Sequence, residues 1–380
     1  MKKVITNPFV TSGYISPDYF CDRTDETKRI INAISSKRNL TLISLRRMGK
    51  TGLLKHVSHL LEHSEKTYSV IFVDLLPTTN ANEMLNTLSS ALLRQRKGEK
   101  NFLEKLLSLL ATLRPKVTYD SLTGQPAIEL MVESQAEIKS GLEHILKNIS
   151  EIRKDTVIMF DEFQQINNYP EKNIEHLLRT IFQAYPEIPF IYSGSSRHML
   201  ERMFLSAGSP FYQSSELMYL DRIKENEYIE FVNEQFSKGA KSISAQALNQ
   251  VLNWTRTHTW YVQYCLSHLF DREETYLDQA EVNQTLNTIL TEFEPLYVTY
   301  RNLIPGHQFR LLQAIAAEDG VTQPTSGTFI RKHNLTSASS VATSVKALSD
   351  KEMIVRDREK WIVYDVFFSR WLEYHYYRQG

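Results

Sequence analysis

Residues 40–51 read Leu-Thr-Leu-Ile-Ser-Leu-Arg-Arg-Met-Gly-Lys-Thr, and this stretch decides the fold of the chain. Its apolar beginning, 40–45, is typical of a buried strand, and residues 50–62 carry apolar side chains at helical spacing. Between the strand and the helix, Ser44, Gly49, Lys50 and Thr51 match the pattern G-x-x-x-x-G-K-[ST], with serine in place of the first glycine. The stretch therefore predicts a phosphate-binding loop in an α/β fold.

The residue types in this loop suit phosphate chemistry. Backbone N–H groups at a helix N-terminus bind phosphate oxygens, and Gly49 lets the backbone come close to them. Lys50 is expected to neutralise the β- and γ-phosphates, and the Thr51 hydroxyl to ligate Mg²⁺. The alternative is an exposed glycine-lysine turn that only begins a helix. The full set of candidate ligand-binding residues in this stretch is Ser44, Arg46, Arg47, Met48, Gly49, Lys50, Thr51 and Gly52.

Two later strand ends carry polar residues that complete such a site. The apolar strand 156–160 runs into Asp161 and Glu162, 110 residues after Thr51. An acid at this point of a P-loop protein holds Mg²⁺, and its neighbour polarises the attacking water, so Asp161 and Glu162 are the candidate metal and catalytic residues.

The third segment is the strand 189–193, after which Ser195 and Arg197 are candidates for sensing the γ-phosphate. A glycine-serine loop with a surface arginine is the alternative reading of this segment. An acidic turn that caps a buried strand is the corresponding alternative for Asp161 and Glu162.

The rest of the chain divides into three predicted domains, 1–222, 223–302 and 303–380. In the first domain, further strands are predicted at 68–75 and 216–220. Helices are predicted at 80–95, 101–113, 134–152 and 171–184. A hairpin or ordered insertion is predicted at 117–132. Continuously apolar strands separated by helices indicate a parallel sheet covered on both faces.

After Arg222 the strand patterns almost disappear. Helices are predicted at 224–237, 244–254, 260–271 and 278–293, which form a small helical domain. Helices at 308–317, 325–333 and 337–350 then precede two strands, 353–356 and 361–364. Three helices followed by a hairpin predict a winged helix.

Composition excludes several classes of protein. The 380 residues contain 44 Lys+Arg and 44 Asp+Glu, so the chain as a whole is not polycationic. The two cysteines, Cys21 and Cys265, have no metal-site spacing and cannot build a disulfide framework. No apolar run reaches the roughly 18 residues that span a bilayer. With no signal-peptide pattern at the N-terminus, we expect a cytoplasmic protein without membrane association.

The order of these segments resembles the archaeal-type ATPase family, in the STAND branch of AAA+-related P-loop ATPases. Residues 7–9 and 20–26 are similar to its N-P-F…F-v-G-R..E opening, and 46–51 to its R-R-x-G-K-T loop. Residues 161–164 are similar to its D-E-[FIW]-Q motif, 193–195 to its G-S-S segment, and 365–372 to its closing D-P-F-F-x-x-W-L.

The resemblance implies ATP and Mg²⁺ as cofactors and a regulatory function. It also places Arg23 at the nucleotide, because the opening motif frames the adenine. Three positions depart from the family pattern: Ser44, Asp22 in place of the opening glycine, and 257–259 in place of a G-x-P turn. We therefore expect nucleotide binding with slow hydrolysis.

Three functions are compatible with these segments. The first is an ATP-binding switch whose nucleotide bridges the α/β and helical domains and whose partner is another protein or a second copy. The second is a DNA-binding regulator, less favoured because residues 303–380 hold 10 Lys+Arg against eight Asp+Glu and the candidate recognition helix carries only Lys346. The favoured alternative to DNA binding is that the winged helix packs within the chain or on a protein. Its aromatic residues Trp361, Phe367, Phe368 and Trp371 then anchor it or fill its own core. A small-molecule kinase ranks last.

Overall fold

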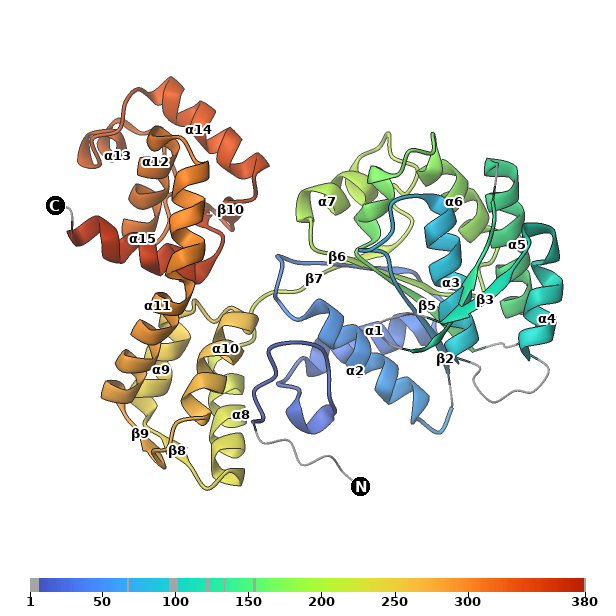
Figure 1. Ribbon diagram of the computed structural model, residues 1–380, viewed down its shortest axis with the longest axis horizontal. Coiled ribbons are helices and arrows are strands. Elements are labelled where there is room, and N and C mark those ends of the chain that lie inside the picture. Colours follow the sequence, from blue (N-terminus) through green and yellow to red (C-terminus); the bar gives the residue numbers. More distant parts are fainter. Residues whose placement is uncertain are drawn as a thin grey trace. The chain divides into compact units, whose positions relative to one another are not determined.

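The computed structural model describes residues 7–66, 68–95, 102–119, 124–132, 134–152 and 155–378. These residues belong to two compact units (Figure 1). The N-terminal unit is Ser12–Ile223, and the C-terminal unit runs from Lys224 onward and includes the segment 7–11. The three-domain division with boundaries at 222 and 302 stays a prediction.

A parallel five-stranded sheet in the order β2-β5-β6-β1-β7 forms the centre of the N-terminal unit. Its strands are β1 (Leu40–Ile43), β2 (Ser69–Asp74), β5 (Thr156–Asp161), β6 (Phe190–Gly194) and β7 (Glu216–Tyr219). Every residue of β1, β5 and β6 is buried, because helices cover both faces of the sheet. This burial is the reason why these strands are continuously apolar, and it confirms the predicted α/β class.

The helices lie in two layers, and each layer has its own core. On one face, α1 (Thr24–Ser35) and α2 (Lys50–Glu62) pack on the sheet (Figure 1). The other face is covered by α3 (Ala81–Gln95), α5 (Gln135–Ile152), α6 (Ile174–Gln183) and α7 (Arg197–Leu205). Two short 3-10 helices, η1 (Pro17–Tyr19) and η3 (Phe163–Asn168), precede α1 and α6.

The insertion between α3 and α5 contains the predicted hairpin. It consists of α4 (Phe102–Leu109), η2 (Ala111–Leu113) and the antiparallel pair β3 (Lys116–Tyr119) and β4 (Pro126–Glu129). β4 lies along α3, where the Ile128 N–H donates to Ser90 Oγ at 2.9 Å. Residues 120–123 of the predicted hairpin 117–132 lie outside the described residues.

The C-terminal unit is mainly helical. Its first part contains α8 (Glu225–Lys238), α9 (Ala245–Trp254), α10 (Thr259–Phe270) and α11 (Gln279–Leu303), with the short strands β8 (Ser242–Ile243) and β9 (Tyr276–Leu277). Its second part contains α12 (Gly306–Ala317), α13 (Gly327–Lys332), α14 (Ala338–Asp350), β10 (Ile354–Asp357), β11 (Lys360–Val363) and α15 (Val366–Arg378). The second part is the predicted winged helix with one further helix.

Aromatic packing joins the two parts of this unit. The Phe367 ring is fully buried and lies 4.7–5.9 Å, between ring centroids, from the rings of Trp254, Trp260, Tyr261, Tyr264 and Phe293. Arg256 adds polar contacts, since its guanidinium donates to Asp319 Oδ1 at 2.7 Å and to Ser369 Oγ at 2.8 Å. The winged helix is therefore anchored on the helical part of its own unit.

The segment 7–11 extends this packing. The Phe9 ring is buried and contacts those of Phe231, Phe236 and Phe270. Asn7 Nδ2 donates to the Ser267 carbonyl at 2.8 Å. The N-P-F opening thus contributes to the core of the C-terminal unit.

Several elements differ from the sequence-based prediction. Helices α1, α7 and α15 were not predicted, the predicted helix 101–113 ends at Leu109 before a 3-10 turn, and the predicted helix 171–184 begins only at Ile174. Helix α11 continues past the predicted end at 293 and through Pro295 to Leu303. The buried Tyr297 ring packs on Phe368 and Trp371, and this packing offsets the backbone hydrogen bond that Pro295 cannot donate. Within the described residues, no helix combines the length and apolar character needed to cross a membrane.

We predict that Phe367→Ala destabilises the C-terminal unit by about 3–5 kcal/mol, because it empties a fully buried aromatic site. All four tryptophans lie after Lys224, so tryptophan fluorescence during denaturant unfolding reports on this unit alone. Tyr374→Ala on the same helix is the control, since Tyr374 is 44% exposed. Equal destabilisation by both variants would contradict the anchoring role of Phe367.

Candidate functional site

The loop between β1 and α2 has the backbone of an anion-binding turn. Arg47 and Gly49 both adopt left-handed conformations, with φ of 63° and 90°. Gly49 is the N-cap of α2 and offers no side-chain cap, so the backbone N–H groups of the first helical turn can serve an anion. Arg46 and Arg47 are exposed, whereas Met48 is buried beneath the loop.

Lys50 is the most strongly perturbed cation of the loop. Its side chain is buried, and its Nζ donates to Ser44 Oγ at 3.1 Å and to the Leu45 carbonyl at 3.2 Å. Burial lowers the pKa of Lys50 to about 8, although the nearby carboxylates of Glu162 and Asp161 favour its charged form. The serine in place of the first glycine thus provides a hydrogen-bond acceptor for this lysine.

Thr51 and Asp161 meet directly. The Thr51 hydroxyl donates to Asp161 Oδ2 at 2.5 Å, which joins the first turn of α2 to the end of β5. A hydroxyl and a carboxylate at one point are ligands that suit Mg²⁺, which usually keeps several waters and takes only one or two protein carboxylates. The two predicted metal ligands therefore lie together in the structure.

Asp74 is a further acid at this edge that the sequence analysis missed. It ends β2 opposite Asp161 in the parallel register. Burial, followed by the charges of Asp161 and Glu162, raises its pKa, although a hydrogen bond from the Leu76 N–H opposes the shift. The available signal was the acid at the end of the predicted strand 68–75.

Glu162 is held by the next strand of the sheet. Its Oε2 accepts hydrogen bonds from the Ser195 hydroxyl at 2.7 Å, the Ser195 N–H at 3.2 Å and Gln164 Nε2 at 2.5 Å. Glu162 has a left-handed backbone, with φ of 54°. The structure therefore brings Ser195 to Glu162 and adds Gln164, to which the sequence analysis assigned no role.

The two predicted arginines have different surroundings. Arg23 is buried and donates to the carbonyls of Met48 at 3.2 Å and Asp221 at 2.7 Å. Its hydrogen bond to Met48 stabilises the loop between β1 and α2. Arg197 donates to Glu201 at 2.9 Å, and its guanidinium lies 5.2 Å from the centre of the Tyr219 ring. The side chain of Arg197 thus contacts Glu201 of its own helix, α7, and Tyr219 of β7.

Gly52, the last residue of the predicted loop, lies beside Phe20. A Cβ at Gly52 would lie 3.7 Å from Phe20 Cε2, which is ordinary contact. The Phe20 ring stacks on His56 of α2, with centroids 4.3 Å apart. The opening motif 20–26 thus lies against the first two turns of α2.

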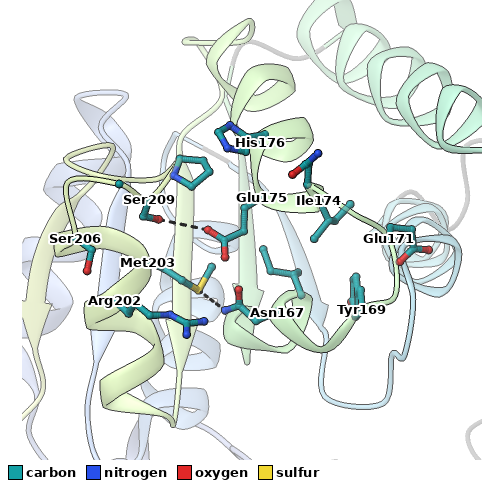
Figure 2. Close-up of a pocket in the computed structure, with 14 residues that line it drawn as sticks. Asn167, Tyr169, Glu171, Ile174, Glu175, His176, Arg202, Met203, Ser206 and Ser209 are labelled. Atoms are coloured by element: carbon teal, nitrogen blue, oxygen red, sulfur yellow. Dashed lines mark hydrogen bonds between the residues drawn. The ribbon is translucent and has the colours of Figure 1, made fainter.

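A separate pocket lies at the ends of η3 and α7 and the start of α6 (Figure 2). It has a volume of about 490 Å³, and Arg202 extends into it from α7. Ser209 Oγ donates to Glu175 at 3.3 Å across one side, and Asn167 contacts Met203 on the other. None of the predicted site residues lines it.

Two family models match this chain. Residues 20–264 match the family model described as an ATPase domain predominantly from Archaea, and residues 295–374 match that of a probable winged helix domain. Among curated proteins, none has significant sequence similarity to the chain.

Solved structures with the same fold cover nearly the whole chain. The Walker-type ATPase of Pyrococcus abyssi superposes with a TM-score of 0.65 at 15% identity, over 96% of this chain and 99% of that one. The ORC1 protein of Aeropyrum pernix, solved in complex with DNA, superposes with a TM-score of 0.50 at 13% identity, over 96% and 95% of the two chains. At these identities the likeness shows the fold.

We predict that Lys50→Met makes the unliganded protein more stable at pH 7, by up to about 3 kcal/mol, since it removes a buried charge with a pKa near 8. Below pH 8 the folded protein carries the full cost of the charged lysine. Between pH 8 and about 10.5 the unfolded chain binds more protons than the folded one, so wild-type stability rises with pH.

The difference between the two proteins should therefore narrow from pH 8 to 10. Scanning calorimetry at a series of pH values measures the stability of wild type and of Lys50→Met. The other titrating groups are common to both proteins, so their effects cancel in the difference between the two stabilities. A difference that stays constant across this range would contradict the depressed pKa.

Proposed function

This chain belongs to the family of ATPase domains found predominantly in Archaea, and we propose that it is a regulatory switch that binds Mg²⁺-ATP and hydrolyses it slowly. The observation that carries this proposal is the meeting of Thr51 and Asp161, at 2.5 Å, beside the buried Lys50. A hydroxyl, a carboxylate and a buried ammonium group at the start of a helix are the set that a metal-bound polyphosphate needs.

The binding roles follow from position. The N–H groups around Gly49 and the Lys50 ammonium would hold the β- and γ-phosphates, with Arg46 at the loop surface adding positive charge near Lys50. Thr51 and Asp161 would hold Mg²⁺, which, when bound, neutralises the phosphate charge that develops during transfer. Arg23 supports this loop through the Met48 carbonyl, so its role is positioning.

Hydrolysis requires a group that polarises water, and Glu162 is the candidate. It follows Asp161 directly, and its Oε2 is fixed by Ser195 and Gln164. Among the described residues, Oε1 of Glu162 has no hydrogen bond, so this oxygen is available to orient a water. Arg197 would have to leave Glu201 before it could contact a γ-phosphate.

Two features support slow turnover. Ser44 Oγ accepts a hydrogen bond from Lys50, and this bond competes with phosphate for the same ammonium group. Three hydrogen bonds occupy one oxygen of Glu162, so only its other oxygen is open to a water. Slow hydrolysis suits a switch, because the lifetime of the ATP state then sets the length of the signal.

The regulatory role is supported by the two-unit organisation. A compact unit that contains a winged helix follows the nucleotide-binding unit along the chain. A change from ATP to ADP would alter the conformation of this unit, or the binding of a protein partner or of a second copy of the chain. ADP is then the ligand of the second state.

A DNA-binding regulator is the second candidate. The winged-helix match and the exposed face of α14, which includes Thr343 and Lys346, favour it. The near balance of charge after residue 303 speaks against tight phosphate-driven binding. Fluorescence anisotropy with duplex DNA at physiological salt separates the two candidates.

We predict that Glu162→Gln keeps Mg²⁺-ATP binding within a few-fold of wild type and lowers hydrolysis by roughly 100-fold or more, because the amide cannot polarise water. Asp161→Asn should instead weaken binding, and only in the presence of Mg²⁺, since it removes the metal-facing charge. Isothermal titration and single-turnover hydrolysis measure both. Undiminished turnover in Glu162→Gln would show that another group activates the water.

A further inference from the structure

Within the part of the chain that the structure describes, hydrogen bonds hold the carboxylate of Glu162 through one oxygen, Oε2. Two of its three hydrogen-bond donors belong to Ser195, and the third is Gln164 Nε2 at 2.5 Å. Ser195 reaches Glu162 from the end of β6, whereas Gln164 reaches it from η3, two residues further along the chain. Donors from two directions fix where the free oxygen, Oε1, points.

The orientation of the Gln164 amide is determined by its neighbour. A carboxylate has no proton to donate, so the NH₂ group must face Glu162, and Gln164 Oε1 must face the other way. On that side lies Gly194, at the end of β6. A Cβ built on Gly194 would lie 1.9 Å from Gln164 Oε1 and 3.0 Å from its Cδ.

Gly194 is therefore required by space and not by its backbone angle. Among the described glycines, those with a left-handed φ are Gly13, Gly49, Gly124 and Gly320, so Gly194 has a backbone that other residues adopt. The side chain closest to the position of its missing Cβ is that of Gln164, which is only 8% exposed, and Leu200 Cδ1 lies 3.0 Å from the same position. The segments 161–164 and 193–195 thus fit together as one unit.

From this geometry we infer that Gln164 is a positioning residue that sets the orientation of Glu162 for hydrolysis, and that Gly194 is present to make room for it. The inference rests on the proposed function, because it concerns the proposed catalytic carboxylate. Glu162 has a left-handed backbone, which a non-glycine residue keeps only when its surroundings hold it. The hydrogen bond from Gln164 is one of the restraints that hold it.

The first test compares Gln164→Met with Gln165→Met. Methionine keeps the bulk of glutamine and removes its donor. Gln165 is the matched control, since it is the next residue of η3 and its Nε2 donates to the Thr78 carbonyl, away from Glu162. Affinity is measured with a fluorescent ATP analogue and kcat with ATP.

We expect Gln164→Met to lower kcat by about 10-fold or more while the dissociation constant changes by less than about twofold, because a misdirected carboxylate affects the chemical step and not binding. Gln165→Met should keep kcat within about twofold of wild type. Undiminished kcat in Gln164→Met, or a parallel loss of affinity, would overturn the positioning role.

The second test does not depend on turnover. Gly194→Ala should lower the melting temperature in the wild-type background, and by less than about half as much in the Gln164→Ala background, where the 1.9 Å overlap with Gln164 is gone and only the 3.0 Å contact with Leu200 Cδ1 remains. Equal losses in both backgrounds would overturn the fit between Gln164 and Gly194. If the wild-type protein binds nucleotide without hydrolysing it, the proposed ATPase function is wrong. The comparison of the Gly194→Ala and Gln164→Ala variants still shows whether the side chain of Gln164 packs against Gly194.

Discussion

The hydrogen bond between the Thr51 hydroxyl and Asp161 is the contact on which the site depends. It links the first turn of α2 to the end of β5, two elements separated by 110 residues of chain. Its geometry follows from the sheet, because parallel strands deliver their carboxyl ends to one edge. The loop after β1 and the acids after β5 meet at that edge, although β6 lies between these two strands.

At the same carboxyl edge of the sheet, one buried lysine lies close to two carboxylates. Lys50 is buried next to Asp161 and Glu162, and burial outweighs their attraction, since its pKa falls to about 8. Such a lysine is costly in the unliganded protein, and in the proposed function a bound phosphate would give it a strong partner. A stability cost of this kind is what a ligand-binding site carries.

Much of the fold was predictable because its strands are fully buried. The apolar runs at 40–45 and 156–160 are typical of buried strands, and they form β1 and β5. Gly49-Lys50-Thr51 indicates where the loop after the first of these strands ends and the next helix begins. The strands β10 and β11 of the hairpin lie within one residue of the predicted strands 353–356 and 361–364. The pairing of Thr51 with Asp161 could also be expected, from the order of the motifs alone.

The remaining features depend on contacts that a sequence pattern does not carry. Helix α11 passes through Pro295 because Tyr297 is anchored by rings from α15, a helix that was itself not predicted. Gln164 belongs to the D-E-[FIW]-Q motif, but its proposed role does not follow from the sequence, because it depends on the Gln164 side chain lying where Gly194 has no Cβ. Arg197 satisfied the pattern of a phosphate sensor, but its hydrogen bond goes to Glu201, one turn further along its own helix.

As a switch, the protein is proposed to change conformation with its nucleotide state. Small-angle scattering of Glu162→Gln, which should hold ATP without cleaving it, tests this claim most directly when it is compared with the ADP-bound and nucleotide-free protein. Lys50→Ala, which lacks the buried ammonium, is the control. The account predicts that the radius of gyration with Mg²⁺-ATP differs from that with Mg²⁺-ADP in Glu162→Gln, and that Lys50→Ala gives one curve under all conditions. Superimposable curves for Glu162→Gln at saturating ATP and ADP would contradict the switch.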